Sequence, residues 1–297
     1  MNNLKGVFPP IITTFKENGS IDLEASKKHI DFLVARGVDG IAFFGTSGEF
    51  FSISLEEKKN YIDEVLKYVN GRVKILVGVG GTNKNEVIEF LDYLKEKEIA
   101  GVLLINPYFV VYDENEVEDY YNYIAQKTEF NIIIYNFPQL TGFNFNPELV
   151  KRLVRKNKNI VGIKDTISDQ GHLIDMLEVK EENKDFIVYC AFESQAFGAL
   201  INGVEGFINA TANFVPEFTV GLWKNYQEKN LEQCSEYYQK MCDAMKVYKL
   251  SSPLLLACKQ AVYDIVLGYE GFERKPALPL SNENKEKLKE ILRELLK

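Results

Sequence analysis

One lysine stands at the end of an apolar segment, where a charged side chain is least expected. Lys164 follows residues 160–163 (IVGI), a run typical of a buried strand. Burial removes hydration from an ammonium group and favours the neutral amine, which can attack a ketone and form an imine. We therefore expect Schiff-base chemistry at Lys164. The alternatives are a lysine that reaches solvent along the strand end or one that pairs with Asp165.

Two further groups could serve such chemistry. Tyr135 ends the preceding apolar segment, and its phenol could transfer protons, unless it is a core tyrosine with a satisfied hydroxyl. Residues 45–49 (GTSGE) place Thr46 and Ser47 between two glycines, so the backbone can turn sharply and present N–H and O–H donors to a carboxylate. The alternative for this segment is an ordinary turn.

Other kinds of site are disfavoured. Residues 45–49 are not a P-loop, and residues 78–81 (GVGG) lack the spacing of a dinucleotide fingerprint. The two histidines, His29 and His172, lie in helical patterns away from any metal-ligand cluster, so we expect surface or packing roles for both. The sequence therefore disfavours zinc chemistry and Ser-His-Asp chemistry.

Composition narrows the partners and the compartment. The 35 basic and 43 acidic residues give a net charge of −8, which argues against nucleic acid but not against small anions held by local donors. The N-terminus shows no basic segment followed by an apolar run, and no window reaches about 18 apolar residues. Without a C-x-x-C pair, the four cysteines are expected to be reduced thiols. We expect a cytoplasmic protein that binds no membrane.

The elements that must position these residues repeat along the chain. Each short apolar run is followed by an amphipathic stretch, which is a β-α unit repeated eight times. The pattern predicts an α/β protein, a (β/α)8 TIM barrel, whose active site lies at the carboxyl ends of the strands. The predicted strands are 7–15, 40–44, 74–79, 101–105, 131–135, 160–164, 186–190 and 206–208.

The helices carry recognisable ends. Residues 21–36 have Asp22 near the start and Gly37 after the end, while Ser54 with Glu57 predicts a capping box. Asn146 is expected to cap the helix that begins at Pro147. Three helical patterns follow the eighth unit, at 227–248, 252–267 and 284–296. We therefore predict a catalytic barrel over residues 1–226 and a C-terminal helical extension, packed on it, over residues 227–297.

The motifs together resemble the class I (Schiff-base) pyruvate aldolases of the dihydrodipicolinate synthase and N-acetylneuraminate lyase family. The resemblance covers essentially the whole chain and rests on residues 45–49 (GTSGE), 135–138 (YNFP) and 162–166 (GIKDT). It implies a barrel with a C-terminal helical extension, usually a homotetramer built as a dimer of dimers, with no metal and no organic cofactor.

The resemblance also implies residue roles. Lys164 would be the Schiff-base lysine, Tyr135 the acid/base phenol, and Thr46 both a member of its proton relay and a substrate ligand. Thr46 and Ser47 would bind the pyruvate carboxylate. The remaining substrate-binding residues that we expect are Gly48, Tyr108, Leu140, Thr166, Ala191 and Ile208.

Departures from the family pattern point to a subgroup. The synthase places an arginine where this chain has Leu140, so the guanidinium that pairs with a carboxylate of its aldehyde substrate is missing. Its lysine-feedback site also looks absent, and the match to the sialic-acid lyase is poor after the seventh strand and at Ala210. The sequence resembles most the 2-keto-3-deoxygluconate aldolase type, in which Thr166 could hold a substrate hydroxyl.

Two substitutions affect the expected site directly. The family usually has a second tyrosine, donated across the dimer, where this chain has Phe109, which has no hydroxyl to relay protons. The relay could pass through Tyr108, Tyr112 or water, or be lost. Ala191 replaces the usual glycine after the seventh strand and could narrow the pocket.

The leading hypothesis is reversible aldol cleavage of a 2-keto-3-deoxy sugar acid to pyruvate and an aldehyde. One alternative is 4-hydroxy-tetrahydrodipicolinate (dihydrodipicolinate) synthase, which a coupled assay with aspartate semialdehyde would reveal. The other is a non-catalytic 2-oxo acid binding protein, motivated by Phe109, in which an imine forms without turnover.

Overall fold

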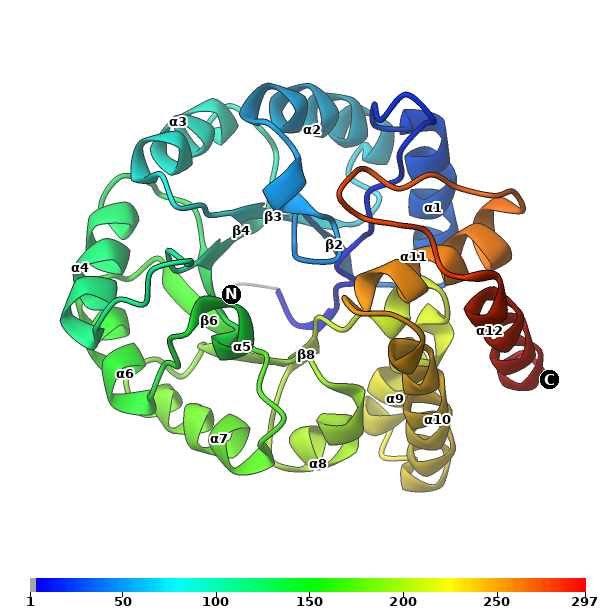
Figure 1. The fold of residues 1–297 in the computed structure, drawn as a ribbon. Coiled ribbons are helices and arrows are strands. Elements are labelled where there is room, and N and C mark those ends of the chain that lie inside the picture. Colours follow the sequence, from blue (N-terminus) through cyan, green and yellow to red (C-terminus); the bar gives the residue numbers. More distant parts are fainter. Residues whose placement is uncertain (1–3) are drawn as a thin grey trace. The chain divides into compact units, whose positions relative to one another are not determined.

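The computed structural model describes residues 4–297, in which eight strands alternate with helices. The strands form one sheet in the order β1-β8-β7-β6-β5-β4-β3-β2, and the chain has the predicted (β/α)8 barrel fold. Figure 1 shows this alternation from blue to yellow-green, followed by helices alone from yellow to red. The strands are β1 (Gly6–Val7), β2 (Gly40–Phe43), β3 (Lys74–Val79), β4 (Gly101–Ile105), β5 (Ile132–Asn136), β6 (Ile160–Asp165), β7 (Ile187–Cys190) and β8 (Gly206–Phe207).

Helices separate the strands and form the C-terminal segment. The α-helices are α1 (Leu23–Ala35), α2 (Leu55–Val69), α3 (Lys84–Leu94), α4 (Glu114–Ala125), α5 (Pro138–Thr141), α6 (Pro147–Lys156), α7 (Gln170–Asp175), α8 (Ala196–Ile201), α9 (Pro216–Gln227), α10 (Leu231–Ala244), α11 (Leu255–Val262) and α12 (Asn282–Leu295). Short 3-10 helices are η1 (Phe50–Ser52), η2 (Met176–Glu181), η3 (Glu193–Gln195), η4 (Thr211–Asn213) and η5 (Met245–Leu250), and η6 (Tyr263–Leu267) is a π-helix.

Contacts divide the chain into two compact units. The first contains the residues up to Gly6 together with Lys74–Ile208, and the second contains Val7–Val73 together with Asn209–Lys297. The division of the chain at residue 226/227 into barrel and extension stays a prediction.

The first unit holds the strands that carry Tyr135 and Lys164. Its strands β3 to β8 pair in parallel, each with the next. Every residue of β4, β5 and β6 is buried, so these strands are covered on both faces, as their unbroken apolar sequences predict. The polar side chains at their carboxyl ends are therefore held by a rigid apolar layer.

In the second unit one asparagine anchors the first segment of the chain. Asn213 accepts a hydrogen bond from the Ile12 N–H (3.2 Å) and donates one to the Pro10 carbonyl (3.0 Å). Its own carbonyl accepts a bond from Nε2 of His29 at 2.8 Å. Helices α9 and α10 lie side by side in the same unit, where the Cys234 thiol contacts the Leu222 carbonyl at 3.7 Å (Figure 1).

Several predicted boundaries were wrong. The first strand was expected over residues 7–15 but ends at Val7, because Pro9 and Pro10 have no N–H to continue a ladder. Only single bonds continue beyond it, from Ile11 N–H to the Ala42 carbonyl and from Ala42 N–H to the Pro9 carbonyl. The remaining strand ends differ by one residue at most.

The helix ends follow their caps. Asp22, Ser54 and Asn146 accept the expected backbone bonds, and Ser54 with Glu57 forms the predicted capping box. The predicted helices at 227–248 and 252–267 start later, at Leu231 and Leu255, and each changes to a tighter or wider helix near its end. The last helix starts two residues earlier than predicted because Ser281 caps it.

Candidate active site

Lys164 and Tyr135 lie side by side at the carboxyl ends of β6 and β5. The two residues are direct partners in the strand register, and both side chains are only 4% exposed. The Lys164 Nζ atom lies 3.9 Å from the centre of the Tyr135 ring. No ion pair joins Lys164 to Asp165 within residues 4–297. A buried amine against a phenol is therefore the first part of the predicted site that the structure brings together.

The residues expected around the substrate lie on the neighbouring strand ends of the first unit. Thr166 follows β6, Ala191 follows β7, and Ile208 follows β8, and all three are buried. The Ile208 N–H donates to the Cys190 carbonyl at 3.2 Å, which ties the last two strand ends together. The Thr166 hydroxyl oxygen is buried without a hydrogen-bond partner among the described residues. A buried hydroxyl without a partner is a candidate for a substrate contact.

The loops after β4 and β5 carry Tyr108, Phe109 and Leu140. Tyr108 is half-buried, and burial raises the pKa of its phenol, so the hydroxyl stays protonated at neutral pH. Phe109 has a left-handed backbone (φ 78°) and is 95% exposed, and Leu140 is 53% exposed. Gly142 holds the two loops together: its φ is 74°, and a Cβ there would lie 2.5 Å from Val111 Cγ2.

The loop with Thr46 and Ser47 belongs to the second unit, where it forms a tight turn after β2. The Glu49 N–H donates to the Thr46 carbonyl (3.0 Å), and Thr13 Oγ1 donates to the Gly48 carbonyl (2.7 Å). A Cβ on Gly48 would lie 3.0 Å from the Ile11 carbonyl oxygen, so only glycine fits this close approach without a shift. Ser47 is buried and Thr46 is half-buried. Hydrogen bonds therefore hold the backbone of the turn that carries the Thr46 and Ser47 hydroxyls.

A buried charge cluster lies at the end of this loop. Lys259 of α11 is fully buried and forms ion pairs with Glu49 and with Glu273, the latter at 2.6 Å. The contact with Glu49 Oε1 is an ion pair without hydrogen-bond alignment. Burial raises the pKa of Glu273, with Lys259 opposing and Glu49 adding to the shift. The sequence does not predict this cluster, because Glu49 lies more than 200 residues before Lys259 and Glu273.

A second buried network lies beside Lys164 and was also missed. Asp165 is 0% exposed, and its two carboxylate oxygens take different partners. Asn136 Nδ2 donates to Oδ1 at 2.8 Å, and His172 Nδ1 lies 2.9 Å from Oδ2. His172 Nε2 lies 2.8 Å from the carbonyl oxygen of Phe145. The expected surface or packing role therefore fits His29, which is fully buried, but not His172.

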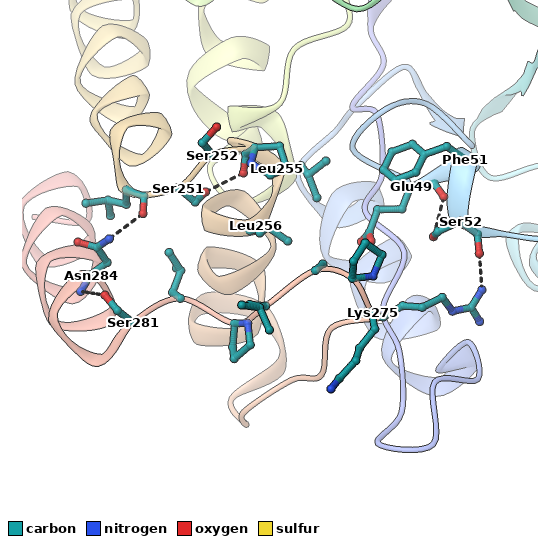
Figure 2. Close-up of a pocket in the computed structure, with 18 residues that line it drawn as sticks. Glu49, Phe51, Ser52, Ser251, Ser252, Leu255, Leu256, Lys275, Ser281 and Asn284 are labelled. Atoms are coloured by element: carbon teal, nitrogen blue, oxygen red, sulfur yellow. Dashed lines mark hydrogen bonds between the residues drawn. The ribbon is translucent and has the colours of Figure 1, made fainter. Parts of the chain in front are cut away.

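The second unit contains a cavity of about 730 Å³. It is lined by Glu49, Phe51, Ser52 and by residues of two segments, 250–256 and 274–284. Figure 2 shows these side chains, with Asn284 donating to the Leu250 carbonyl at 2.9 Å and Glu49 and Phe51 at the other end. No sequence motif predicts this cavity.

The described residues contain neither a metal-ligand group nor a single helix that could span a membrane. Among residues 4–297, no group of His, Cys, Asp and Glu side chains could hold a metal ion. In the same part of the chain no single helix is long and apolar enough to cross a membrane. One sharply bent pair, Leu231–Leu250 with Leu255–Leu267, passes by length and composition only when taken together.

Comparison with known proteins now identifies the family. The model of the dihydrodipicolinate synthetase family matches residues 3–295. The chain belongs to the dihydrodipicolinate synthetase family. Membership identifies it as an enzyme, a carbon–carbon lyase of the class I aldolase type, as the motifs predicted.

Relatives of several kinds lie within this family. YjhH of Escherichia coli, named a probable 2-dehydro-3-deoxy-D-pentonate aldolase, is 34% identical, covering 98% of this chain and 97% of its own. The crystal structure of YagE, an Escherichia coli K12 prophage protein of the same family in complex with pyruvate, is 34% identical with a TM-score of 0.94, covering 99% of both chains. Dihydrodipicolinate synthase from Thermotoga maritima is 27% identical with a TM-score of 0.91, covering 98% of both chains.

Proposed function

We propose that this chain catalyses the reversible aldol cleavage of a 2-keto-3-deoxy sugar acid to pyruvate and an aldehyde through a Schiff base on Lys164. The observation that carries the proposal is the buried Lys164 amine against the Tyr135 ring at adjoining strand ends. The names of two relatives support the substrate class. YjhH is named for a 2-dehydro-3-deoxy sugar acid, and YagE is provisionally named a 2-dehydro-3-deoxy-D-gluconate aldolase.

The reaction begins at the ketone. The Lys164 amine attacks C2, the resulting carbinolamine loses water, and a protonated imine forms. A base removes the proton of the C4 hydroxyl, the C3–C4 bond breaks, and its electron pair moves toward the imine nitrogen to give an enamine. The aldehyde leaves, C3 takes up a proton, and hydrolysis of the imine releases pyruvate and the free amine.

Tyr135 is the group we assign to the proton steps. Tyr135 is in direct register with Lys164, so its phenol can exchange protons at the carbinolamine hydroxyl, which leaves as water, and at the C4 hydroxyl. Thr46 and Ser47 are assigned to the substrate carboxylate, with Thr46 also relaying protons, on their match to the family motif. Their turn suits this role because hydrogen bonds hold its backbone in place before the substrate binds.

Leu140 supports an uncharged aldehyde over aspartate semialdehyde. Its half-exposed isobutyl side chain cannot pair with a carboxylate, whereas the guanidinium expected of the synthase can. Thr166, Tyr108, Ala191 and Ile208 are assigned to the substrate as the sequence predicts. The Thr166 hydroxyl is assigned to a sugar hydroxyl because it has no hydrogen-bond partner among the described residues.

We also propose a homotetramer, built as a dimer of dimers, in the cytoplasm. The apolar residues Phe109–Tyr112 support self-association, since all four side chains of this loop are exposed. An exposed apolar run of this kind on a folded unit indicates an interaction surface.

Borohydride reduction in the presence of pyruvate tests the proposal. We expect a covalent adduct on the peptide that contains Lys164, and none in Lys164→Arg, whose guanidinium cannot form the imine. The absence of an adduct in the native chain would refute Schiff-base chemistry. Steady-state assays then separate the alternatives: cleavage of keto-deoxy sugar acids supports the aldolase, comparable rates with aspartate semialdehyde favour the synthase, and trapping without any turnover indicates a binding protein.

A further inference from the structure

The network around Asp165 contains a charge that the proposed reaction does not use. Asp165 follows Lys164 on β6, so the two side chains point to opposite faces of the strand. Asp165 is fully buried, and a buried carboxylate is costly unless it is paired. It also favours the ammonium form of any neighbouring lysine, which cannot attack a ketone. The carboxylate therefore needs a counter-charge if Lys164 is to act as a nucleophile.

Hydrogen-bond chemistry fixes the charge of the pair. His172 Nε2 faces the Phe145 carbonyl, which can only accept, so Nε2 carries a proton. Nδ1 faces the carboxylate oxygen Oδ2 at 2.9 Å, and this contact requires a second proton between the two atoms. Whichever atom holds that proton, the imidazole and the carboxylate together are neutral.

The surrounding groups support a protonated His172. Burial lowers the pKa of His172, but the hydrogen bond and charge of Asp165, the Phe145 carbonyl and the charge of Asp169 outweigh it and leave the pKa raised. Asp165 is further contacted by Asn136, which holds its other oxygen, and it pairs in register with Cys190. The Cys190 thiol has a raised pKa from burial, with Glu193 and Asp165 adding to the shift, so it carries no charge at neutral pH.

We propose that His172 is a positioning residue that neutralises Asp165 and thereby keeps the neighbouring Lys164 available as a free amine. The benefit to catalysis rests on the proposed Schiff-base function. The neutralisation of Asp165 on β6 by His172 does not, because it exists without substrate. Removing the imidazole while leaving the carboxylate gives a net negative charge beside Lys164. Removing both the imidazole and the carboxylate, or the carboxylate alone, leaves no negative charge beside Lys164.

Competitive labelling of Lys164 with acetic anhydride, read by mass spectrometry across a pH series, measures this balance without pyruvate. In His172→Gln we expect the midpoint of Lys164 labelling to rise by about one pH unit, the size of shift that one nearby uncompensated charge produces. In Asp165→Asn and in the double variant we expect the native midpoint. His29→Gln is the matched control, because it removes a buried histidine that has no contact with Asp165.

Each result decides the proposal. A native midpoint in His172→Gln, or a midpoint that stays raised in the double variant, would overturn it and indicate a structural role alone. If His172→Gln does not fold, NMR titration of the native chain decides, since there are only two imidazoles to assign. We expect the pKa of His172 to lie above that of an ordinary histidine and the pKa of His29 to lie near 4; a neutral His172 beside a charged Asp165 would refute the proposal. Neither measurement depends on aldolase activity, so a failed borohydride trap would count against the proposed function only.

Discussion

At the scale of single residues, the candidate site separates side chains that the sequence reveals from those it hides. Lys164 and Tyr135 were predictable because each is a polar residue at the end of an apolar run, and parallel strands align such ends. His172 was not predictable, because only the fold brings α7 and the Phe145 carbonyl to Asp165. The charge of a histidine depends on those contacts and not on its local sequence.

Tyr135→Phe tests the proton-transfer role. We expect the rate of sugar-acid cleavage to fall by roughly 100- to 10,000-fold, the usual loss when a general acid–base group is removed. Steady-state kinetics measure it. Tyr68→Phe is the control, since its hydroxyl donates to the Asp31 carboxylate of the second unit and is not assigned to the reaction. An equal loss in both variants would contradict a specific role for Tyr135.

Thr166→Val tests the assignment of an unpaired hydroxyl to the substrate. We expect the KM for the keto-deoxy sugar acid to rise about tenfold, the effect of losing one hydrogen bond. Borohydride trapping of pyruvate by the valine variant should be unchanged, because pyruvate lacks the sugar hydroxyl groups that Thr166 is proposed to bind. The free energy of unfolding should not fall, since the hydroxyl has no partner in the described chain. Thr166→Ser should keep the native KM, and an unaltered KM in the valine variant would remove Thr166 from the site.

At the scale of elements, the cluster of Glu49, Lys259 and Glu273 joins the turn after β2 to helix α11. The turn itself was predictable from its glycines, but its attachment was not, because α11 reads as an ordinary apolar helix around Lys259. Glu49 adopts a left-handed backbone (φ 53°), a conformation that non-glycine residues rarely hold without support. The ion pair with Lys259 provides such support.

Lys259→Met should therefore be severely destabilising. It leaves Glu49 and Glu273 buried without a cation, and breaking a buried ion pair in this way costs about 3–5 kcal/mol. Urea unfolding at pH 7 measures the change. Lys246→Met is a matched control in which an exposed lysine loses only a surface partner, Asp243, and it should have little effect. Equal unfolding free energies for the two variants would show that the cluster contributes nothing.

At the scale of the whole molecule, the eight β-α units and the family could be read from the sequence, because the repeat of apolar runs is strong. The boundary between the two compact units could not, since it cuts across β1 and returns after β8. Its position depends on which segments contact one another after folding. Asn213, which binds the Pro10 and His29 segments, is an example of a contact that no local pattern predicts.

Because His29 is buried, we expect the protein to lose stability in acid. Burial lowers its pKa from 6.5 to about 4 in the folded chain, so the unfolded chain takes up a proton more readily. The stabilisation is present above pH 6.5 and is lost as the pH falls toward 4, by up to roughly 3 kcal/mol. Urea unfolding at pH 7 and at pH 5 measures the free energy of unfolding. Between these two pH values it should decrease less in His29→Gln than in the native chain. An identical decrease in both would exclude His29 as the cause.

Two cysteines differ in accessibility, and the rates at which they are modified can measure how often the sheet opens locally. Cys190 lies on β7 opposite Asp165, fully buried, whereas the Cys242 side chain is partly accessible. A thiol reagent therefore meets Cys242 in the native chain but reaches Cys190 only during moments when the edge between β6 and β7 separates. The ratio of the two modification rates reports how often the strand that carries Lys164 separates from its neighbour, in a sample that contains no substrate.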